Sequence, residues 1–310
     1  MIKNGIYKKK ILIIQTRPGI GDMCVFYPPI REISQKFENY DLHLLTKKRS
    51  HAKDFLKNEK FIKKIIYIPK YGAIKLNYSL FKILKKENYN KCFIMHYGLR
   101  YFFLALLAKI KIIFFYGLFK KNENIVKKSR DATCNWLGYK KLNFKSNINF
   151  KIKKIKKNQI TIGIGGSGDN KKWHINNYIQ LIKMIIKKNP NIKILLAGGR
   201  NEIKDEKKII KAINIKPKNI NSLCNLNIKE AIKHLYQSKL YLGNDTGFMH
   251  LSGCMGIKSY GLFGTTSTNY SSYNKMIYPI TSKRVKMHSG SSKMDNIKIE
   301  YVFKKIIKHL

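Results

Sequence analysis

Short apolar runs alternate with segments of helical periodicity along most of this chain. The first run, Lys10–Gln15 (KILIIQ), has the length of a buried strand, and apolar residues at helical spacing follow over Met23–Phe37. Strands that alternate with helices in this way form βαβ units with a parallel sheet. In the first half we also expect strands at Leu42–Leu45, Lys64–Ile68, Lys91–Met95 and Ile112–Tyr116, and helices at Phe55–Ile62, Leu76–Lys86 and Arg100–Ala108.

A second alternating series begins at Gln159, after the charged stretch Lys151–Asn158. The chain has 310 residues, whereas a common single domain has about 150. We therefore expect an α/β protein of two Rossmann-like domains, residues 1–150 and 151–310. Expected strands are Gln159–Ile164, Ile192–Ala197, Leu240–Leu242 and Ser259–Phe263, and expected helices are Asn176–Lys188, Glu202–Ala212, Asn227–Ser238, Phe248–Met255 and the basic, amphipathic Ile299–Leu310. We expect the last helix to pack on the first domain, and contact with a membrane is the alternative.

Positive charge dominates the composition, with 63 Lys and Arg against 17 acids and a net charge of +46. Only seven of the cations are Arg, the residue favoured for recognising phosphates and bases, and the lysines are scattered along the sequence. This charge would attract an anionic membrane surface, a phosphorylated acceptor or the phosphates of nucleic acid. We expect no specific nucleic-acid binding.

The sequence also excludes several classes of protein. Apolar residues make up 44% of the chain, which is enough for packed cores. No run reaches the roughly 18 apolar residues of a membrane-spanning helix. The first residues lack a signal-peptide core, and the five cysteines stand apart as expected of reduced thiols. We therefore expect a cytoplasmic protein without a metal site or cofactor.

Four loops that directly follow expected strands carry residues suited to chemistry, because ligands of parallel α/β sheets bind beyond the carboxyl ends of the strands. The first loop contains Gly19, Gly21 and Asp22. Asp22 falls near the start of a helix, where it could simply cap the helix. Alternatively, its carboxylate is available as a general base.

The second loop, Gly163–Gly168, formally matches the dinucleotide pattern G-x-G-x-x-G, but its first glycine lies inside the strand and no acid follows about 20 residues later. A flexible loop that ends near Lys171 is suited to hold phosphate. The third loop ends at Glu202, which either favours the first turn of the next helix or accepts hydroxyls of a ribose.

The fourth loop runs from Gly243 to His250. Thr246 and Gly247 place backbone amides at the start of a helix, which is a ready site for an anion. A single histidine on a helix is more often a satisfied core residue than a functional one. The position of His250 one turn after this anion site favours a functional role.

Taken together, these segments resemble the family 9 glycosyltransferases, the ADP-heptose:lipopolysaccharide heptosyltransferases. The resemblance covers about residues 10–305 and rests on ILIIQTRPGIGDM, GIGGSGDNKKW, LLAGGRNE and above all LGNDTGFMHLSGCMGIKSYGLFGTT. It implies a GT-B fold, in which two Rossmann-like domains face each other across a cleft. It also implies inverting, metal-independent transfer.

The resemblance further implies a role for each matching residue. Asp22 is expected to act as the general base, and Trp173 to be structural. The remaining residues are expected to bind the nucleotide sugar: Ser167 and Lys171 the diphosphate and sugar, Glu202 the ribose, Asp245 the sugar hydroxyls, Thr246 and Gly247 the diphosphate, and His250 the donor nearby.

The resulting hypothesis is a transferase that moves a heptose from ADP-heptose to an anionic, lipid-linked lipopolysaccharide acceptor at the inner face of the inner membrane. The segment after Gly264, where many relatives carry cysteines, has none here. Those thiols are therefore dispensable, or this chain uses another nucleotide sugar for a surface glycan. A non-catalytic nucleotide- or nucleic-acid-binding protein is the remaining alternative.

Overall fold

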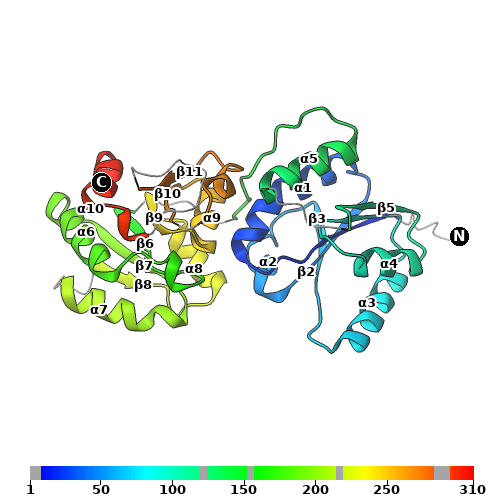
Figure 1. The fold of residues 1–310 in the computed structure, drawn as a ribbon, viewed down its shortest axis with the longest axis horizontal. Helices are drawn as coiled ribbons and strands as arrows, with labels where there is room; N and C mark the ends of the chain where they lie inside the picture. The colour runs from blue at the N-terminus through cyan, green and yellow to red at the C-terminus, as the bar shows by residue number, and fades with distance from the viewer. Residues whose placement is uncertain (1–7, 119–123, 152–156, 214–218, 265, 283–293) are drawn as a thin grey trace, which may run out of the picture. The chain divides into compact units, whose positions relative to one another are not determined.

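The computed structural model describes residues 8–118, 124–151, 157–213, 219–264, 266–282 and 294–310. The chain forms two compact units, Met1–Ser146 and Asn147–Leu310 (Figure 1). Each unit has a parallel sheet with helices on it, so the expectation of a two-unit α/β protein is confirmed. Residues 152–156 of the expected charged linker lie outside the described part of the chain.

The sheet of the first unit has the strand order β3-β2-β1-β4-β5, and its strands are parallel. The central strand is buried throughout, with Ile11, Leu12, Ile13 and Ile14 at most 1% exposed, because helices cover both faces of a parallel sheet. The elements are β1 (Lys10–Gln15), α1 (Ile20–Lys36), β2 (Asp41–Thr46), α2 (Ala52–Phe55), β3 (Ile62–Tyr67), α3 (Ala73–Glu87), β4 (Lys91–Ile94), α4 (Arg100–Leu107), β5 (Ile112–Phe115) and α5 (Ile125–Leu137).

Two predictions for this unit differ from the structure. The helix expected at Phe55–Ile62 is the shorter α2, which ends at Phe55, and Ile62 already belongs to β3, where it is in register with Leu42. Ile62 therefore pairs within the sheet, although helical spacing had assigned it to a helix. The second difference is α5, which the sequence analysis did not predict and which begins at an Asn124 cap.

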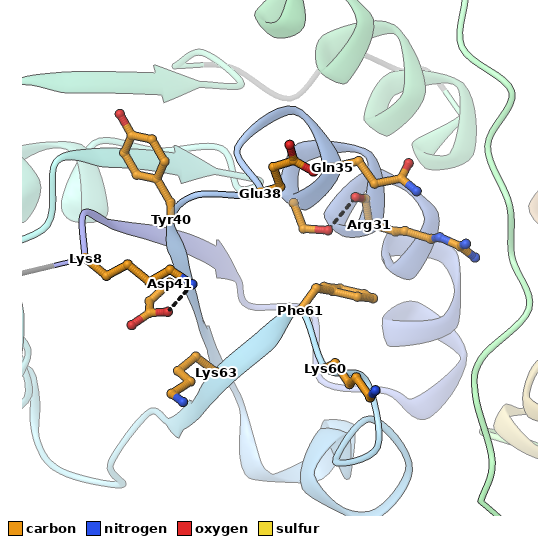
Figure 2. A pocket seen from close by; sticks show the side chains of 10 residues that line it. Lys8, Arg31, Gln35, Glu38, Tyr40, Asp41, Lys60, Phe61 and Lys63 are labelled. Atoms are coloured by element: carbon orange, nitrogen blue, oxygen red, sulfur yellow. Dashed lines mark hydrogen bonds and ion pairs between the residues drawn. The ribbon is translucent and has the colours of Figure 1, made fainter. Parts of the chain in front are cut away.

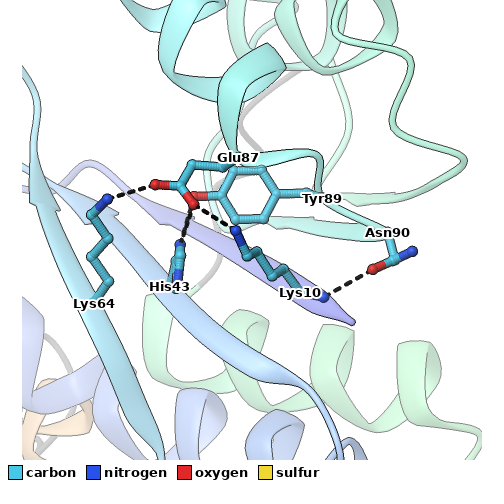
Figure 3. Close-up of polar contacts among 6 residues, drawn as sticks. All are labelled: Lys10, His43, Lys64, Glu87, Tyr89 and Asn90. Carbon is cyan, nitrogen blue, oxygen red and sulfur yellow. Dashed lines mark hydrogen bonds and ion pairs between the residues drawn. The ribbon is translucent and has the colours of Figure 1, made fainter. Parts of the chain in front are cut away.

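A cluster of charged and aromatic side chains fastens the end of α3 to the amino edge of this sheet (Figure 3). The carboxylate of Glu87 accepts hydrogen bonds from Lys10 of β1 and Lys64 of β3. Burial raises the pKa of Glu87, but these two hydrogen bonds and the nearby His43 outweigh burial and lower it to about 2. Glu87 is therefore ionised at every physiological pH and holds three elements together.

The sheet of the second unit has the order β11-β10-β9-β6-β7-β8 and is again parallel. The edge strands β8 and β11 were not predicted, whereas the other strands and the helices lie at the expected places. The elements are β6 (Gln159–Gly163), α6 (Ile175–Lys188), β7 (Lys193–Ala197), α7 (Ile203–Ile213), β8 (Ile220–Ser222), α8 (Ile228–Leu235), β9 (Leu240–Asn244), α9 (Gly247–Cys254), β10 (Lys258–Leu262), β11 (Ile277–Ile280) and α10 (Ile299–Ile306).

The last helix, α10, packs against α6. Its apolar residues Val302 and Ile306 are 0% exposed and belong to the core of the second unit. The second unit therefore covers these two apolar residues of the helix. The indole of Trp173, also in this core, donates a hydrogen bond to the carbonyl of Ile297 just before α10, which supports the structural role expected for Trp173.

None of the helices in the described ranges combines the length and hydropathy needed to cross a bilayer.

Candidate functional site

The carboxyl edge of the second sheet brings three of the four loops together. Gly163 at the end of β6 is in register with Ala197 at the end of β7 and with Gly243 near the end of β9. The loops that follow these strands therefore begin side by side. They contain the expected site residues Ser167 and Lys171, Glu202, and Asp245 to His250.

Two glycines allow this edge to pack tightly. A Cβ on Gly163 would collide with the ring and hydroxyl of Tyr241, and a Cβ on Gly243 would collide with the backbone of Gly163. The role of Gly163 is thus close packing inside the sheet. The first glycine of the G-x-G-x-x-G pattern thus lies inside the strand, as the sequence predicts.

The buried amide of Asn244 organises the glycine-rich loop, and sequence reasoning missed it. Its Nδ2 donates to the carbonyls of Ile164 (3.3 Å) and Gly165 (2.9 Å). Its Oδ1 accepts from the backbone N–H of Trp173 (3.0 Å) and the hydroxyl of Tyr178 (2.8 Å). Asn244 therefore ties both ends of the loop to β9. A polar residue that ends an otherwise apolar strand is the signal that could have revealed it.

Glu202 is 6% exposed and forms two contacts inside the site. Its Oε2 accepts from the N–H of Gly199 (2.8 Å), so the residue does fix the first turn before α7. Its Oε1 lies 2.9 Å from Nζ of Lys172, and this hydrogen bond is the main reason why the pKa of Lys172 is raised. The lysine that joins the glycine-rich loop to Glu202 is thus Lys172, the neighbour of the expected Lys171.

Asp245 and His250 form a buried polar pair at the start of α9. Nε2 of His250 lies 3.2 Å from Oδ1 of Asp245, and Nδ1 lies 3.0 Å from the hydroxyl of Tyr273. The imidazole thus donates from Nε2 to Asp245 and shares a second hydrogen bond with Tyr273 through Nδ1. His250 is 2% exposed and packs between the rings of Tyr270 and Tyr273, as a satisfied core histidine does. It thereby positions Asp245.

The environment of Asp245 favours its ionised form. Its side chain is 9% exposed, and burial raises its pKa. The hydrogen bond and charge of His250, followed by the charge of Lys171, outweigh burial, so that the pKa of Asp245 is lowered. Lys171 therefore lies close enough to Asp245 to act on it electrostatically, whereas Lys172 serves Glu202.

The first turn of α9 lies directly beside this pair. Thr246 is the N-cap residue, and its Oγ1 is 3.2 Å from the hydroxyl of Tyr241. Gly247 is the first helical residue, and the first N–H groups of a helix have no acceptor within the helix. Ser167 is exposed in the glycine-rich loop. The edge thus combines a helix N-terminus, lysines and ionised acids, which suits a ligand with both phosphates and hydroxyls.

Asp22, the remaining expected site residue, belongs to the first unit and lies in the first turn of α1. Its Oδ2 accepts from the N–H of Gly19 (3.1 Å), which is a capping contact. Its Oδ1 accepts from Nε of Arg17 at 2.6 Å, and its side chain is 15% exposed. Asp22 therefore makes a capping contact, and the Arg17 contact fixes the direction of its carboxylate.

The carboxyl edge of the first sheet also carries a cavity of about 610 Å³, which sequence reasoning did not identify. Four of the five strands in this sheet are followed within three residues by a cationic or polar residue that lines the cavity, so the pattern was present in the sequence. Burial and the charges of Lys47 and Arg100 lower the pKa of His96, which favours its neutral imidazole. The basic residues of the lining are Lys47, Lys48, Arg49, Lys70, His96 and Arg100.

A smaller cavity of about 340 Å³ at the amino edge of the same sheet gives a useful contrast (Figure 2). Its lining mixes cations with the acids Glu38 and Asp41, and Lys8 pairs with Asp41 at 3.8 Å. Among the described residues that line the cavity at the carboxyl edge, none is an acid. An anion is therefore favoured at the carboxyl edge, where ligands of parallel sheets bind.

The comparisons with known proteins agree with this architecture. The family model described as glycosyltransferase family 9 (heptosyltransferase) matches residues 79–307, and the chain therefore belongs to this family. A curated relative, lipopolysaccharide heptosyltransferase 1 of Campylobacter coli, is 32% identical over 137 residues. This match spans 43% of the present chain and 40% of the relative.

Solved structures of similar fold cover nearly the whole chain. The ADP-heptose lipopolysaccharide heptosyltransferase II of E. coli has a TM-score of 0.78 at 15% identity, over 97% of this chain and 98% of that one. The family 9 glycosyltransferase of Veillonella parvula DSM 2008 has a TM-score of 0.79 at 14% identity, over 97% of each chain. The E. coli heptosyltransferase WaaC with ADP has a TM-score of 0.75 at 14% identity, over 97% of this chain and 100% of that one. The expected GT-B fold is thus confirmed.

Proposed function

We propose that the protein is an inverting glycosyltransferase that moves a heptose from ADP-heptose to an inner-core acceptor of lipopolysaccharide. One observation carries this proposal: in a family 9 chain, the carboxyl edge of the second sheet gathers Glu202 with Lys172, Asp245 with His250, and the start of α9. The names of the relatives supply the sugar and the acceptor.

On the donor side, the diphosphate lies against the first turn of α9, at Thr246 and Gly247, with Lys171 as its cation. Glu202 accepts the ribose hydroxyls with its remaining lone pairs, and Ser167 contacts the phosphates from the glycine-rich loop. Asp245, ionised and held by His250, accepts hydroxyls of the heptose. The helix terminus and the lysine stabilise the negative charge that grows on the departing diphosphate.

On the acceptor side, Asp22 removes the proton of the attacking hydroxyl. The acceptor oxygen forms a bond to the anomeric carbon while the bond from that carbon to the diphosphate breaks, and ADP leaves with the electron pair. One displacement of this kind inverts the anomeric centre. The cationic cavity of about 610 Å³ supports an acceptor that carries negative charge, and we place the reaction at the cytoplasmic face of the inner membrane.

The replacement Asp22→Asn tests the proposal, because an amide keeps the shape of the carboxylate but cannot take the proton. With ADP-heptose and an inner-core acceptor, we expect ADP release to fall by about 10²–10⁴-fold while the dissociation constant of ADP stays unchanged. The control is Asp54→Asn, which removes an acid paired with His51 in the same unit and should leave turnover unchanged. Unchanged turnover in Asp22→Asn would refute the role of Asp22.

A panel of nucleotide sugars tests the donor separately. Binding to the folded protein raises the temperature of unfolding, and at equal concentration a ligand of higher affinity raises it further. We expect ADP-heptose to stabilise the protein more than UDP- and GDP-sugars do. Stronger stabilisation by a UDP- or GDP-sugar would instead indicate a transferase for another surface glycan.

A further inference from the structure

Exposed apolar side chains concentrate in one part of the first unit. Of the twelve large apolar side chains that are exposed among the described residues, nine lie between residues 71 and 118. A protein surface rarely leaves so many large apolar groups together in water without a partner. Seven of them lie on or next to α3 and α4: Tyr71 (48%), Ile74 (88%), Tyr78 (58%), Leu99 (40%), Phe103 (52%), Leu106 (47%) and Leu107 (66%).

These side chains share one surface, which we term the α3–α4 face. The two helices contact each other and lie on the same side of the sheet (Figure 1). Their inner sides are fully used, since Leu80 and Leu84 of α3 and Leu104 of α4 are buried in one core. The exposed residues occupy the opposite, outer side of the same helices. The α3–α4 face is therefore a second apolar side that the fold itself does not cover.

The charge of this region is almost entirely positive. Among residues 70–112 the only acid is Glu87, which lies at the amino edge and is paired with Lys10 and Lys64. On α3 the ammonium groups of Lys75 and Lys82 lie over the rings of Tyr71 and Tyr78, at 4.8 and 4.5 Å from the ring centres. Tyrosine rings next to lysines are typical of groups that rest at a membrane–water interface.

We propose that the α3–α4 face binds the surface of an anionic phospholipid bilayer. Phe103, Leu106 and Leu107 would enter the boundary between head groups and acyl chains, and the lysines around them would contact the lipid phosphates. The last helix, the alternative considered from the sequence, has its apolar residues Val302 and Ile306 buried in the second unit.

The α3–α4 face is continuous with the cationic cavity, because Leu76 of α3 and Leu99 and Arg100 at the start of α4 line it. A bilayer on this face would lie next to the cavity. The benefit of this arrangement rests on the proposed function, since it brings the glycan of a lipid-linked acceptor to the cavity without removing the lipid from the membrane. Binding to lipid can nevertheless be measured without donor or acceptor.

The test is flotation of the full chain with vesicles of phosphatidylethanolamine and phosphatidylglycerol. The double variant Phe103→Ser/Leu107→Ser keeps the charge and alters only exposed positions. We expect its partition coefficient to fall by at least about tenfold. The matched control Ile210→Ser/Tyr278→Ser alters exposed apolar residues of the second unit and should change partitioning by less than about twofold.

A second pair of variants separates a local contact from general attraction. Lys75→Gln/Lys82→Gln and Lys208→Gln/Lys211→Gln remove the same charge from α3 and from α7. Greater loss of binding in the α3 pair supports the proposal, and equal loss overturns it. Equal binding of the parent to vesicles of phosphatidylcholine alone would also overturn it. The proposal would also be overturned if the parent formed a dimer and the Phe103→Ser/Leu107→Ser change dissociated it, because the face would then bind a second copy of the chain.

Activity with a soluble acceptor distinguishes this inference from the proposed function. We expect Phe103→Ser/Leu107→Ser to release ADP from ADP-heptose at the parent rate with such an acceptor. A variant that keeps this rate and also keeps full vesicle binding refutes the inference alone. A parent that binds vesicles but transfers no heptose refutes the proposed function alone.

Discussion

Replacing Asn244 by Ala should destabilise the second unit, because it removes a side chain that makes four buried hydrogen bonds. The change leaves the N–H of Trp173 and the carbonyls of Ile164 and Gly165 without their partner, while the hydroxyl of Tyr178 keeps the carbonyl of Gly163 at 2.9 Å. Each buried, unpaired polar group costs about 1–3 kcal/mol. A water molecule in the vacated space can recover part of this cost, so we expect a net loss of about 3 kcal/mol.

Urea unfolding followed by fluorescence measures this loss in the second unit alone. The chain has two tryptophans, Trp136 in the first unit and Trp173 in the second. In a Trp136→Phe background the emission therefore reports the second unit. With a slope of about 2 kcal/mol per molar urea, a loss of 3 kcal/mol lowers the midpoint by about 1.5 M.

The control is Asn225→Ala, which truncates an exposed asparagine in a turn of the same unit and should change the free energy of unfolding by less than about 0.5 kcal/mol. If Asn244→Ala unfolds at the same urea concentration as the parent, Asn244 does not organise the loop and our account of the site is wrong. A large loss for Asn244→Ala should also weaken ADP binding, because the loop it holds would no longer be ordered for the phosphates.

Two further predictions concern charged groups. The pKa of Glu87 lies at about 2 in the folded protein against an ordinary value of 4.5, so its stabilising effect is complete above pH 4.5 and is lost as the pH falls towards 2. The free energy of unfolding falls by an amount on the order of 3 kcal/mol over this pH range. Glu87→Gln should remove this part of the pH dependence. The measurement is urea unfolding followed by the fluorescence of Trp136 in a Trp173→Phe background. Lys172→Met leaves the buried carboxylate of Glu202 without its cation and should destabilise the second unit by about 3 kcal/mol. Lys171→Met should change the free energy of unfolding by less than about 0.5 kcal/mol and should weaken ADP binding about tenfold. For both variants, titration calorimetry measures ADP binding and urea unfolding measures stability. If Lys171→Met lost the stability and Lys172→Met lost only ADP binding, the two lysines would have the opposite roles.

Most of the strands and helices follow from local pattern. Lys10–Gln15 and Gln159–Gly163 are apolar runs of strand length, and a parallel sheet buries such runs on both faces. The elements that escaped prediction have weak local signals. β8 is three residues long, and β11 contains a proline, which a strand accepts mainly at the edge of a sheet, where β11 lies. Ile62 joined a strand because a neighbouring strand was available to pair with it.

The loops of the site could be located from the sequence because glycines and acids stand directly after the apolar runs. The contacts within them could not. Lys171 and Lys172 are adjacent and chemically identical, and only the path of the loop decides that Lys172 reaches Glu202 while Lys171 lies nearer Asp245. The partners of Asn244 come from residues 66 to 80 positions away.

The amino-acid sequence alone thus determined the two alternating series of strands and helices, and with them the sheet edges at which loop residues meet. This information is local, since burial of an apolar run depends on the residues within it. The tertiary structure alone decided which side chains pair, because hydrogen bonds and ion pairs depend on distances of a few ångströms between distant segments. It also decided that α3 and α4 keep an uncovered apolar side, since an amphipathic pattern does not reveal how many sides of a helix the fold will cover.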